Sequence, residues 1–320
     1  MDALVGYTGF VGSNLLLQHE FDKVYNSSNI MEAYGTNPDL CVYAGVRAEK
    51  FLANNNPEAD RAVIESAIEN IKNINPKRLV LISTIDVFKT PYDCDENTPI
   101  VTDGLHAYGY NRYQFERWCL EYVENCYILR LPGLFGKGIK KNFIYDLIHF
   151  LPSTLGETKF DALATKESFL KDCYAKDNNG FYKLSNISNS ERICLTDVFK
   201  RLNFSALNFT DSRAVFQFYN LAYLWKHIMF AVDNEISLLH LAVEPVSACE
   251  LFHAVKGEVF VNEIADKPPL YDVKTIFAEM LGGKNGYIFG KQQIVKEIIG
   301  FVLGYMIENE KKPQGGGDFL

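Results

Sequence analysis

Apolar runs and helical periodicities alternate along the first half of the chain. Short, mainly apolar runs predict strands at 3–5, 21–25 and 79–82, and the run 39–45 predicts a strand that runs into a small-residue turn. A helix start is predicted at 54–58, where asparagines precede a proline and a glutamate. The apolar face predicted for that helix consists of Ala62, Val63, Ala67, Ile68, Ile71 and Ile74. Strands that alternate with helices predict a parallel sheet, and ligands of such sheets bind at the carboxyl ends of the strands.

This pattern continues to about residue 150 and then changes. His106 lies at the opening of a predicted helix that runs to about Asn125, and an apolar stretch from Tyr127 predicts a further strand. Residues 151–214 mix short helical patches with polar loops. From there, strand-like, helical and strand-like stretches follow in turn at 215–219, 221–232 and 237–243. The last predicted helices begin near Ala248 and span 291–308.

The first predicted strand runs into the glycine-rich turn Gly6-Tyr7-Thr8-Gly9-Phe10-Val11-Gly12, after which Ser13–Gln18 reads as the opening of a helix. At this spacing Gly6 lets the chain turn off the strand, Gly9 lets the backbone approach a pyrophosphate, and Gly12 lets the helix pack on the sheet. Amides at the helix start then attract the anion. A glycine-rich turn without a ligand is the alternative, but the position between a strand and a helix favours a dinucleotide site.

These elements predict an α/β protein, with a Rossmann-type doubly wound parallel sheet and a smaller C-terminal α+β substrate lobe. The sheet domain is predicted at 1–150 and is rejoined by about 215–243. The lobe is predicted at 151–214 and 244–310, and 311–320 is predicted to be a flexible tail.

Polar and small residues follow the second and third predicted strands. The second strand ends in the uncharged residues Asn26, Ser27, Ser28 and Asn29. An acidic residue there would hold the ribose hydroxyls of NAD, whereas these groups accept a ribose or a 2′-phosphate, and an ordinary polar turn is an equal alternative. The third strand ends in Ala44-Gly45, whose small size leaves room for a cofactor. Arg47 and Lys50 follow, and they either reach a phosphate or remain solvated charges.

Hydroxyl groups stand at the carboxyl end of the fourth predicted strand, at Ser83 and Thr84. They either cap a loop or polarise a substrate carbonyl or hydroxyl. Tyr108 and Arg112 are four residues apart on the next helix, so they share one face. A cation beside a phenol lowers the tyrosine pKa, which would make Tyr108 a usable acid/base near neutral pH. From spacing alone, the alternative that the tyrosines of this helix only pack is favoured.

Composition and charge narrow these interpretations. The 320 residues are 48% hydrophobic, which suffices for one large core or two lobes. A net charge of −8 without a basic stripe argues against a nucleic-acid surface. The seven cysteines form no C-x-x-C pair, so reduced thiols in a cytoplasmic protein and no metal site are expected. We expect no signal peptide and no membrane span, because the late apolar stretch at 294–307 is short and carries charges.

Together these segments resemble the extended short-chain dehydrogenase/reductase family of NAD-dependent epimerases and dehydratases. The similar segments are 8–12, 38–45, 82–88, 107–112, 130–136, 216–221 and 239–247. Residues 8–12 resemble the family's T-G-x-x-G cofactor loop, and 38–45 resemble its third strand with the small-residue turn after it. Residues 82–88 resemble the strand that ends in the catalytic Ser/Thr, and 107–112 resemble the Y-G-x-x-K segment. Residues 130–136 resemble the loop over the nicotinamide, and 216–221 and 239–247 resemble the later strands and the start of the substrate lobe. The short connection between the second and third strands is most similar to the dTDP-4-dehydrorhamnose reductase branch.

The resemblance implies NAD or NADP as the cofactor, a nucleotide sugar as the substrate and a homodimer. It implies catalytic roles for Thr84, Tyr108 and Arg112. The cofactor-binding residues that it implies are Gly6, Thr8, Gly9, Phe10, Val11, Gly12, Asn26, Ser27, Ser28, Ala44, Gly45, Ser83, Tyr108, Arg112, Leu131, Gly133 and Leu134. It implies substrate contacts for Thr84, Asp86 and Asn142.

The reaction implied by the resemblance is hydride transfer, in 4-keto-reduction or 4-epimerisation. Tyr108 would move the proton of a sugar hydroxyl, and Thr84 would hydrogen-bond the same oxygen. A dehydratase ranks lower, because Ile85 stands beside Asp86 where an acidic pair would be needed. Arg112 replaces the family's lysine, and an arginine keeps the charge but cannot hand on a proton. This departure favours the alternative, a non-catalytic NAD(P)-binding redox sensor or scaffold.

Overall fold

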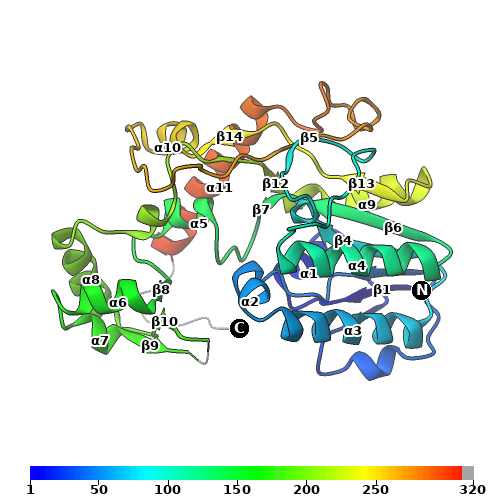
Figure 1. The fold of residues 1–320 in the computed structure, drawn as a ribbon, viewed down its shortest axis with the longest axis horizontal. Coiled ribbons are helices and arrows are strands. Elements are labelled where there is room, and N and C mark those ends of the chain that lie inside the picture. Colours follow the sequence, from blue (N-terminus) through cyan, green and yellow to red (C-terminus); the bar gives the residue numbers. More distant parts are fainter. Residues whose placement is uncertain (178, 312–320) are drawn as a thin grey trace. The chain divides into compact units, whose positions relative to one another are not determined.

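A computed structural model describes residues 1–177 and 179–311, which form two compact units (Figure 1). Unit 1 comprises Met1–Ile139, Val215–Val246 and Pro269–Glu297. Unit 2 comprises Lys140–Ala214, Ser247–Pro268 and the chain from Ile298 onward. The segment 269–297 therefore belongs to unit 1, whereas the sequence analysis assigned it to the lobe. The predicted tail at 311–320 lies outside the described residues, except for Lys311.

Unit 1 is built on a six-stranded parallel sheet in the order β13-β6-β4-β3-β1-β2. Its strands are β1 Asp2–Val5, β2 Lys23–Tyr25, β3 Leu40–Tyr43, β4 Leu79–Thr84, β6 Cys126–Leu131 and β13 Leu238–His240. Every residue of β3 and β6 is buried, as expected for strands covered on both faces. The chain leaves β1 for β2 on one side and returns to β3 on the other. The strand order thus reverses between β1 and β3, the point at which such sheets bind ligands.

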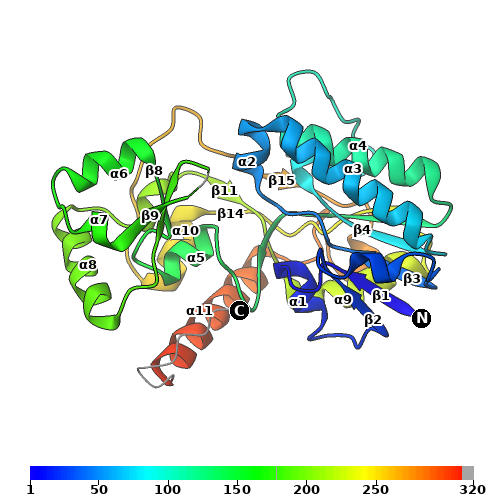
Figure 2. The same ribbon diagram turned by 90° about the horizontal axis from the view of Figure 1, so that it is seen from below.

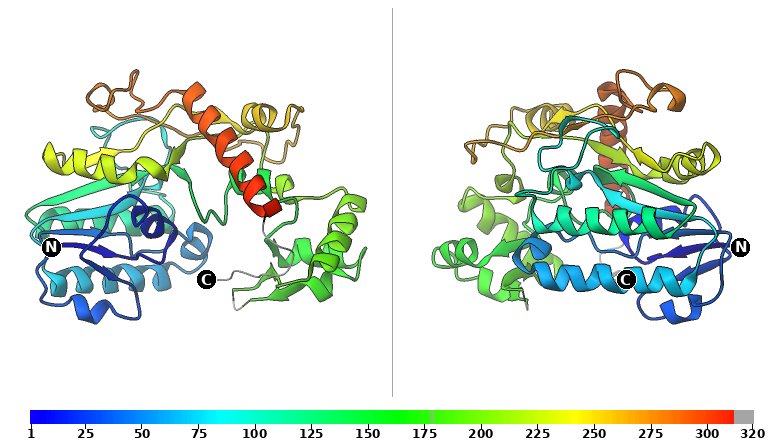
Figure 3. Two further views of the ribbon diagram at one scale, coloured as in Figure 1. Left: turned by 180° about the vertical axis from the view of Figure 1, so that it is seen from behind. Right: turned by 45° about the vertical axis from the view of Figure 1, so that its right-hand side comes forward.

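Helices cover both faces of this sheet (Figure 2). On one face, α3 (Pro57–Ile74) and α4 (Ala107–Tyr122) lie side by side (Figure 3). Their apolar residues form one core with those of β1, β3, β4 and β6. On the other face lie α1 (Phe10–Leu15) and α9 (Leu224–Asp233). The sheet is therefore doubly wound, as the alternation of strands and helices predicts.

The helix α3 begins as predicted, but its buried face differs from the prediction. Asn56 caps it by accepting a hydrogen bond from the Ala59 amide at 3.2 Å, and Pro57 is its first residue. Its buried residues are Ile64, Ala67, Ile71 and Ile74. Ala62 and Val63 are exposed, because a helical repeat through residues 64, 67, 71 and 74 leaves them on the solvent side.

Short elements connect the layers of unit 1. They are η1 Ile30–Ala33, α2 Lys50–Asn55, η2 Ile85–Val87, β5 Tyr92–Cys94, β7 Gly133–Phe135, β11 Val215–Phe216, β12 Phe218–Asn220, η4 Leu221–Tyr223, β15 Asp272–Val273 and η5 Glu279–Leu281, where η denotes a 3₁₀ helix. The strand predicted at 215–219 is thus divided into β11 and β12. Two elements, β14 Val246–Ser247 and α11 Lys291–Lys311, contain boundaries between the units.

Unit 2 has its own small antiparallel sheet, in the order β8-β10-β9. Its elements are α5 Phe143–Ile148, β8 Thr154–Gly156, α6 Glu157–Ala164, α7 Leu170–Cys173, β9 Tyr174–Lys176, β10 Phe181–Leu184, α8 Asn189–Arg201, η3 Ala206–Phe209 and α10 Ala248–Lys256. Leu155, Phe160, Leu170, Leu195 and Phe199 lie in its core. Within the described ranges, no helix in either unit combines the length and apolarity that a transmembrane span requires.

Candidate active site

The glycine-rich turn lies between the carboxyl ends of β1 and β3, at the reversal of strand order. Gly6 has a φ of +90°, and a Cβ there would lie 2.5 Å from the carbonyl oxygen of Ala44, so no other residue fits. A Cβ on Gly12 would lie 2.2 Å from the carbonyl oxygen of Gly6. The packing of the chain itself therefore requires both glycines. Gly45, beside Ala44, is exposed at the same sheet edge.

Gly9 differs, because the protein leaves room beside it. Among the described residues, a Cβ there would meet just the Gly6 carbonyl oxygen, at 3.3 Å. Gly9 is the N-cap of α1, which begins at Phe10 and not at the predicted Ser13, and it offers no capping side chain to the first helical amides. Those amides, on Phe10 and Val11, fit the needs of a pyrophosphate that lies against the backbone.

The turn after β2 is held by its own side chains. Asn26 Oδ1 accepts hydrogen bonds from the Ser28 amide at 2.9 Å and from Ser28 Oγ at 2.6 Å. Asn29 Oδ1 accepts one from the Asn26 amide at 2.8 Å. Ser27 is exposed, as is Thr8 in the glycine-rich turn. This geometry is that of a polar turn, and since the turn lacks a carboxylate, it does not repel a 2′-phosphate.

Thr84 and Tyr108 meet at the carboxyl end of β4. Thr84 ends that strand, and its Oγ1 accepts a hydrogen bond from the Asp86 amide at 3.1 Å. Tyr108 lies in the first turn of α4 and is 5% exposed, and the Thr84 side chain lies near enough to lower its pKa. A Cβ on Gly109 would lie 2.2 Å from the Asp86 carbonyl oxygen, so Gly109 lets α4 approach the loop after β4. The predicted catalytic residues Thr84 and Tyr108 therefore lie near each other at the carboxyl end of β4.

Arg112 lies over the face of the Tyr108 ring, with its guanidinium carbon 4.6 Å from the ring centroid. Its Nη1 and Nη2 each donate to Asp60 at 3.1 Å, and Nη2 also donates to the Arg47 carbonyl oxygen at 2.8 Å. The two side chains of this ion pair are only 6% and 10% exposed. Asp60 therefore neutralises the charge of Arg112 inside the protein.

The net effect on the Tyr108 phenol is opposite to the prediction. Burial, the largest influence, raises its pKa above the ordinary value. Arg112 lowers this pKa as predicted, and Thr84 and Lys50 act in the same direction, but burial outweighs them, and Asp86 raises it further. Arg112 thus acts in the predicted direction, but the net shift of the Tyr108 pKa is upward, and the role of Tyr108 as an acid/base stays a prediction. At neutral pH the phenol is protonated and is a proton donor.

A second cation, Lys50 on α2, lies beside these residues. Its Nζ donates to Asp86 Oδ1 at 2.7 Å and to the Tyr271 hydroxyl at 3.3 Å. The Tyr271 hydroxyl also donates to Asp86 Oδ1, at 3.0 Å. Asn54, one helical turn after Lys50, accepts a hydrogen bond from the Tyr108 amide at 2.9 Å. The sequence analysis did not identify Asn54 or Tyr271, because no local pattern marks residues so distant in the chain.

The segment after β6 is tied to the helix of the glycine-rich turn. Leu131 ends β6, and Gly133 and Leu134 begin β7. The buried side chain of Asn14 on α1 donates to the Lys137 carbonyl oxygen at 2.9 Å and accepts from the Lys137 amide at 3.1 Å. The loop predicted to close over a nicotinamide is thus fixed to the helix that follows the predicted pyrophosphate site.

Asn142 lies in unit 2, apart from the other predicted site residues, which all belong to unit 1. It has a φ of +97° and caps α5, with its Oδ1 accepting from the amides of Ile144 at 3.0 Å and Tyr145 at 3.3 Å. A contact between Asn142 and a substrate stays a prediction.

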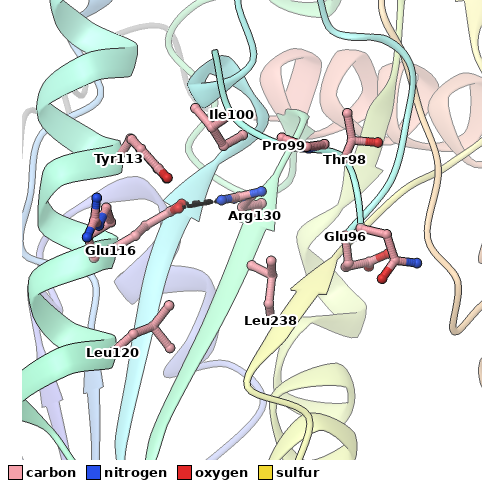
Figure 4. A pocket seen from close by; sticks show the side chains of 11 residues that line it. Glu96, Thr98, Pro99, Ile100, Tyr113, Glu116, Leu120, Arg130 and Leu238 are labelled. Atoms are coloured by element: carbon pink, nitrogen blue, oxygen red, sulfur yellow. Dashed lines mark hydrogen bonds and ion pairs between the residues drawn. The ribbon is translucent and has the colours of Figure 1, made fainter. Parts of the chain in front are cut away.

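Ser83 donates to a buried ion pair that the sequence analysis missed. Its Oγ hydrogen-bonds Glu116, which binds Arg130 through Nε at 3.0 Å and Nη2 at 2.6 Å (Figure 4). His240 Nδ1 lies 3.0 Å from a carbonyl oxygen, so that nitrogen carries the proton and Nε2 accepts from Arg130. The pair lines a cavity of about 390 Å³ between α4 and residues 96–100. No local spacing marks this ion pair, because Glu116 on α4 and Arg130 on β6 lie 14 residues apart in different elements.

No family model and no curated protein sequence matches the chain. Solved structures are similar to it along nearly its whole length. A dTDP-4-dehydrorhamnose reductase from Clostridium acetobutylicum is 13% identical over 95% of this chain and 100% of its own, with a TM-score of 0.61. The chain therefore has the fold of the extended short-chain dehydrogenase/reductases.

Two further solved proteins have this extended dehydrogenase/reductase fold. A UDP-N-acetylglucosamine 4-epimerase from Methanobrevibacter ruminantium is 12% identical over 96% of this chain and 98% of its own, with a TM-score of 0.62. A dTDP-4-dehydrorhamnose reductase from Bacillus anthracis is 14% identical over 96% and 98%, with a TM-score of 0.59. The predicted fold is thus confirmed, and at these identities the activity must be argued from the residues of this chain.

Proposed function

We propose that the protein is an NAD(P)-dependent oxidoreductase or epimerase that acts on a nucleotide sugar by 4-keto-reduction or 4-epimerisation. One observation carries the proposal: the turn with free space at Gly9 and the buried Tyr108–Thr84 pair lie at the carboxyl ends of strands in one parallel sheet. Proteins of the same fold support it. The Bacillus anthracis reductase was crystallised with NADP, and the epimerase with UDP-N-acetylmuramic acid.

NAD or NADP is the cofactor that we propose; its reduced form would supply the hydride for 4-keto-reduction, and its oxidised form would take and return the hydride in 4-epimerisation. The amides of Phe10 and Val11 would hold its pyrophosphate against Gly9. The uncharged turn at 26–29 would face the adenosine ribose and would admit the 2′-phosphate of NADP. Ala44-Gly45 and the segment 131–134 would complete the cofactor site. Ser83 is a weaker candidate for this role, because its hydroxyl already donates to Glu116.

In this proposal Tyr108 transfers the proton to and from the substrate oxygen. Its protonated phenol would give a proton to the substrate oxygen during reduction, and in the reverse direction the phenolate would take the proton back. Thr84 would hydrogen-bond the same oxygen, and Asp86 and Asn142 would contact the substrate. Arg112 would act on Tyr108 through the face of its ring.

A non-catalytic NAD(P)-binding sensor or scaffold is the second candidate. The observation that favours it is the ion pair of Arg112 with Asp60, which ties up the cation beside Tyr108. Both candidates bind the cofactor, so turnover separates them.

The test is a spectrophotometric assay of NADH and NADPH with 4-keto sugar nucleotides that carry dTDP, UDP, GDP or CDP. An epimerase is tested in parallel by following interconversion of the 4-epimers. We expect turnover with at least one sugar nucleotide, and loss of cofactor binding in Gly9→Val. Cofactor binding without any turnover would support the second candidate, and absence of cofactor binding would contradict both.

Further features of the proposal concern partners and location. A homodimer, no contact with nucleic acid and a cytoplasmic location are all proposed from the sequence. The seven cysteines are free thiols, which suits a reducing compartment. Size-exclusion chromatography with light scattering tests the dimer.

A further inference from the structure

The 4-keto-reduction in the proposed function requires a proton supply for Tyr108, because the phenol gives up its proton to the product in each turnover and must regain one from solvent. Arg112 does not meet this need. Its guanidinium stays protonated at any ordinary pH. Its side chain is only 6% exposed and is bound to Asp60 and to the Arg47 carbonyl oxygen.

Lys50 combines the properties that Arg112 lacks. Its ammonium group can release a proton, and 39% of its side chain is exposed, so it can exchange protons with solvent. It is held in place by Asp86 at 2.7 Å and by the Tyr271 hydroxyl at 3.3 Å. Burial lowers the pKa of Lys50, but Asp86 and Tyr271 outweigh burial and raise it overall, so Lys50 is charged at neutral pH.

Two contacts join the surroundings of Lys50 to the start of α4. Asn54, on the same helix as Lys50, accepts a hydrogen bond from the Tyr108 amide at 2.9 Å. Asp86, the partner of Lys50, belongs to the loop whose backbone lies against Gly109. The helix that carries Lys50 and the residue that binds its ammonium thus both lie against the start of α4, at Tyr108 and at Gly109.

We propose that Lys50 is a positioning residue for Tyr108, which stabilises the phenolate formed in each turnover and returns a proton to it by way of water. In that step a Lys50 N–H bond breaks and the Tyr108 O–H bond forms. The neutral amine of Lys50 then takes a proton from solvent, so charge and protons balance over one cycle. The inference rests on the proposed function, because only turnover creates the phenolate.

The pKa of His106 reports the charge of Lys50 and can be measured without substrate. It caps α4, with its Nδ1 accepting from the Gly109 amide at 3.0 Å, and its ring centroid lies 6.3 Å from that of Tyr108. Burial lowers the His106 pKa most, Lys50 lowers it further, and Asp86 raises it. The charged groups that act on Tyr108 are Arg112, Asp86 and Lys50, and the neutral Thr84 hydroxyl also lowers its pKa.

The first measurement is an NMR titration of the His106 ring in Lys50→Met, Lys50→Arg and the parent. The chain has six histidines, and His106→Asn assigns the signal. We expect Lys50→Met to raise the His106 pKa and Lys50→Arg to leave it near the parent value. Lys77→Met is the matched control, because it removes an exposed ion pair with Asp39 elsewhere in unit 1. An unchanged His106 pKa in Lys50→Met would overturn the proposal.

The second measurement is the pH–rate profile of the same variants. Lys50→Met is expected to lower kcat by about tenfold, the effect of one pKa unit on the phenol, with the KM for the cofactor unchanged. Lys50→Arg restores the charge and part of the rate, and added methylamine restores part of the rate of Lys50→Met.

The two proposals fail in different ways. A parent protein without turnover, in which His106 still responds to Lys50→Met, contradicts the proposed function and leaves Lys50 as the cation of this site. An active parent, with kcat unchanged in Lys50→Met, contradicts the role of Lys50 alone.

Discussion

At the scale of single residues, the candidate site is a buried phenol whose pKa is lowered by two cations, each of which is paired with a carboxylate. Arg112 is bound to Asp60 and Lys50 to Asp86, so neither cation acts on Tyr108 with its full charge. Burial therefore determines the protonation state of the phenol. A protonated Tyr108 suits the donation of a proton to a substrate oxygen.

Tyr108→Phe is expected to lower turnover by about 10² to 10⁴-fold, the usual contribution of a positioned acid/base, while thermal stability stays close to that of the parent. Because the Tyr108 pKa is raised, deprotonation of Tyr108 should lower the parent's rate of reduction only above about pH 10. Steady-state kinetics across pH check both outcomes. Tyr110, on the exposed side of the same helix, is the control, and a dead Tyr110→Phe with an active Tyr108→Phe would refute the assignment.

Arg112→Ala is expected to destabilise the fold by about 3 to 5 kcal/mol, because it leaves Asp60 buried without its cation. Arg112→Lys keeps the charge but loses the bidentate geometry, so its cost should be about 1 to 3 kcal/mol. Urea denaturation measures both. Arg61→Ala removes an exposed ion pair with Glu65 on α3, the helix that carries Asp60, and should change stability little. Equal losses in Arg112→Ala and Arg61→Ala would contradict the buried pair.

At the scale of elements, the glycines of the glycine-rich turn have two different functions, close packing of the chain and space for a ligand. Gly6 and Gly12 let the turn, β3 and α1 approach one another, whereas Gly9 leaves space that the protein does not fill. The first two glycines serve the fold, and the third is available for a ligand. Single substitutions therefore distinguish a folding defect from a binding defect.

Gly9→Ala is expected to fold with a melting temperature near that of the parent and to bind NADPH at least tenfold more weakly, a loss of about 1.4 kcal/mol. Gly12→Ala is expected to lower the melting temperature markedly, because its Cβ would lie 2.2 Å from the Gly6 carbonyl oxygen. Thermal unfolding and NADPH fluorescence titration check the pair. Undiminished NADPH binding by Gly9→Ala would refute the pyrophosphate site.

At the scale of the whole molecule, each of the two units has a core of its own. Unit 2 carries two titratable side chains at α5, Asp146 in the helix and His149 at its C-cap, whose charged forms are disfavoured by burial. Burial raises the pKa of Asp146 to about 7, and burial together with Arg192 lowers the pKa of His149 to about 4. The stability of unit 2 should consequently depend on pH in a range where exposed carboxylates do not titrate.

Asp146→Asn is expected to raise the melting temperature relative to the parent at pH 8. The folded pKa of Asp146 is raised above its unfolded value of 3.8, so its favourable contribution is complete below pH 3.8 and is lost as pH rises through about 7. The advantage of the variant should therefore shrink as pH falls from 7 to 4. Calorimetry across this range checks the trend, with Asp197→Asn on the exposed side of α8 correcting for the lost charge. A pH-independent difference between Asp146→Asn and the parent would contradict the buried carboxyl.

The sequence by itself determined the features that depend on local pattern. Apolar runs bounded by polar residues predict the strands of the parallel sheet, because strands covered on both faces need apolar residues throughout. The glycine-rich turn and the Tyr108–Arg112 pair were found from spacing alone, since turns and helix faces repeat over a few residues. Local spacing does not fix the phase of a helix face, which is why Val63 was wrongly assigned to the core of α3.

Only the tertiary structure decided the electrostatics of the site. Asp60 lies 52 residues before Arg112, and Tyr271 lies 185 residues after Asp86, yet each pair shares a hydrogen bond. These partners determine whether a cation acts on Tyr108 or is neutralised, and they come together only when α2, α3 and the segment before β15 pack around the sheet edge. Burial of the phenol has the same origin. A charge interaction depends on distance and desolvation, and neither is encoded in the spacing of residues along the chain.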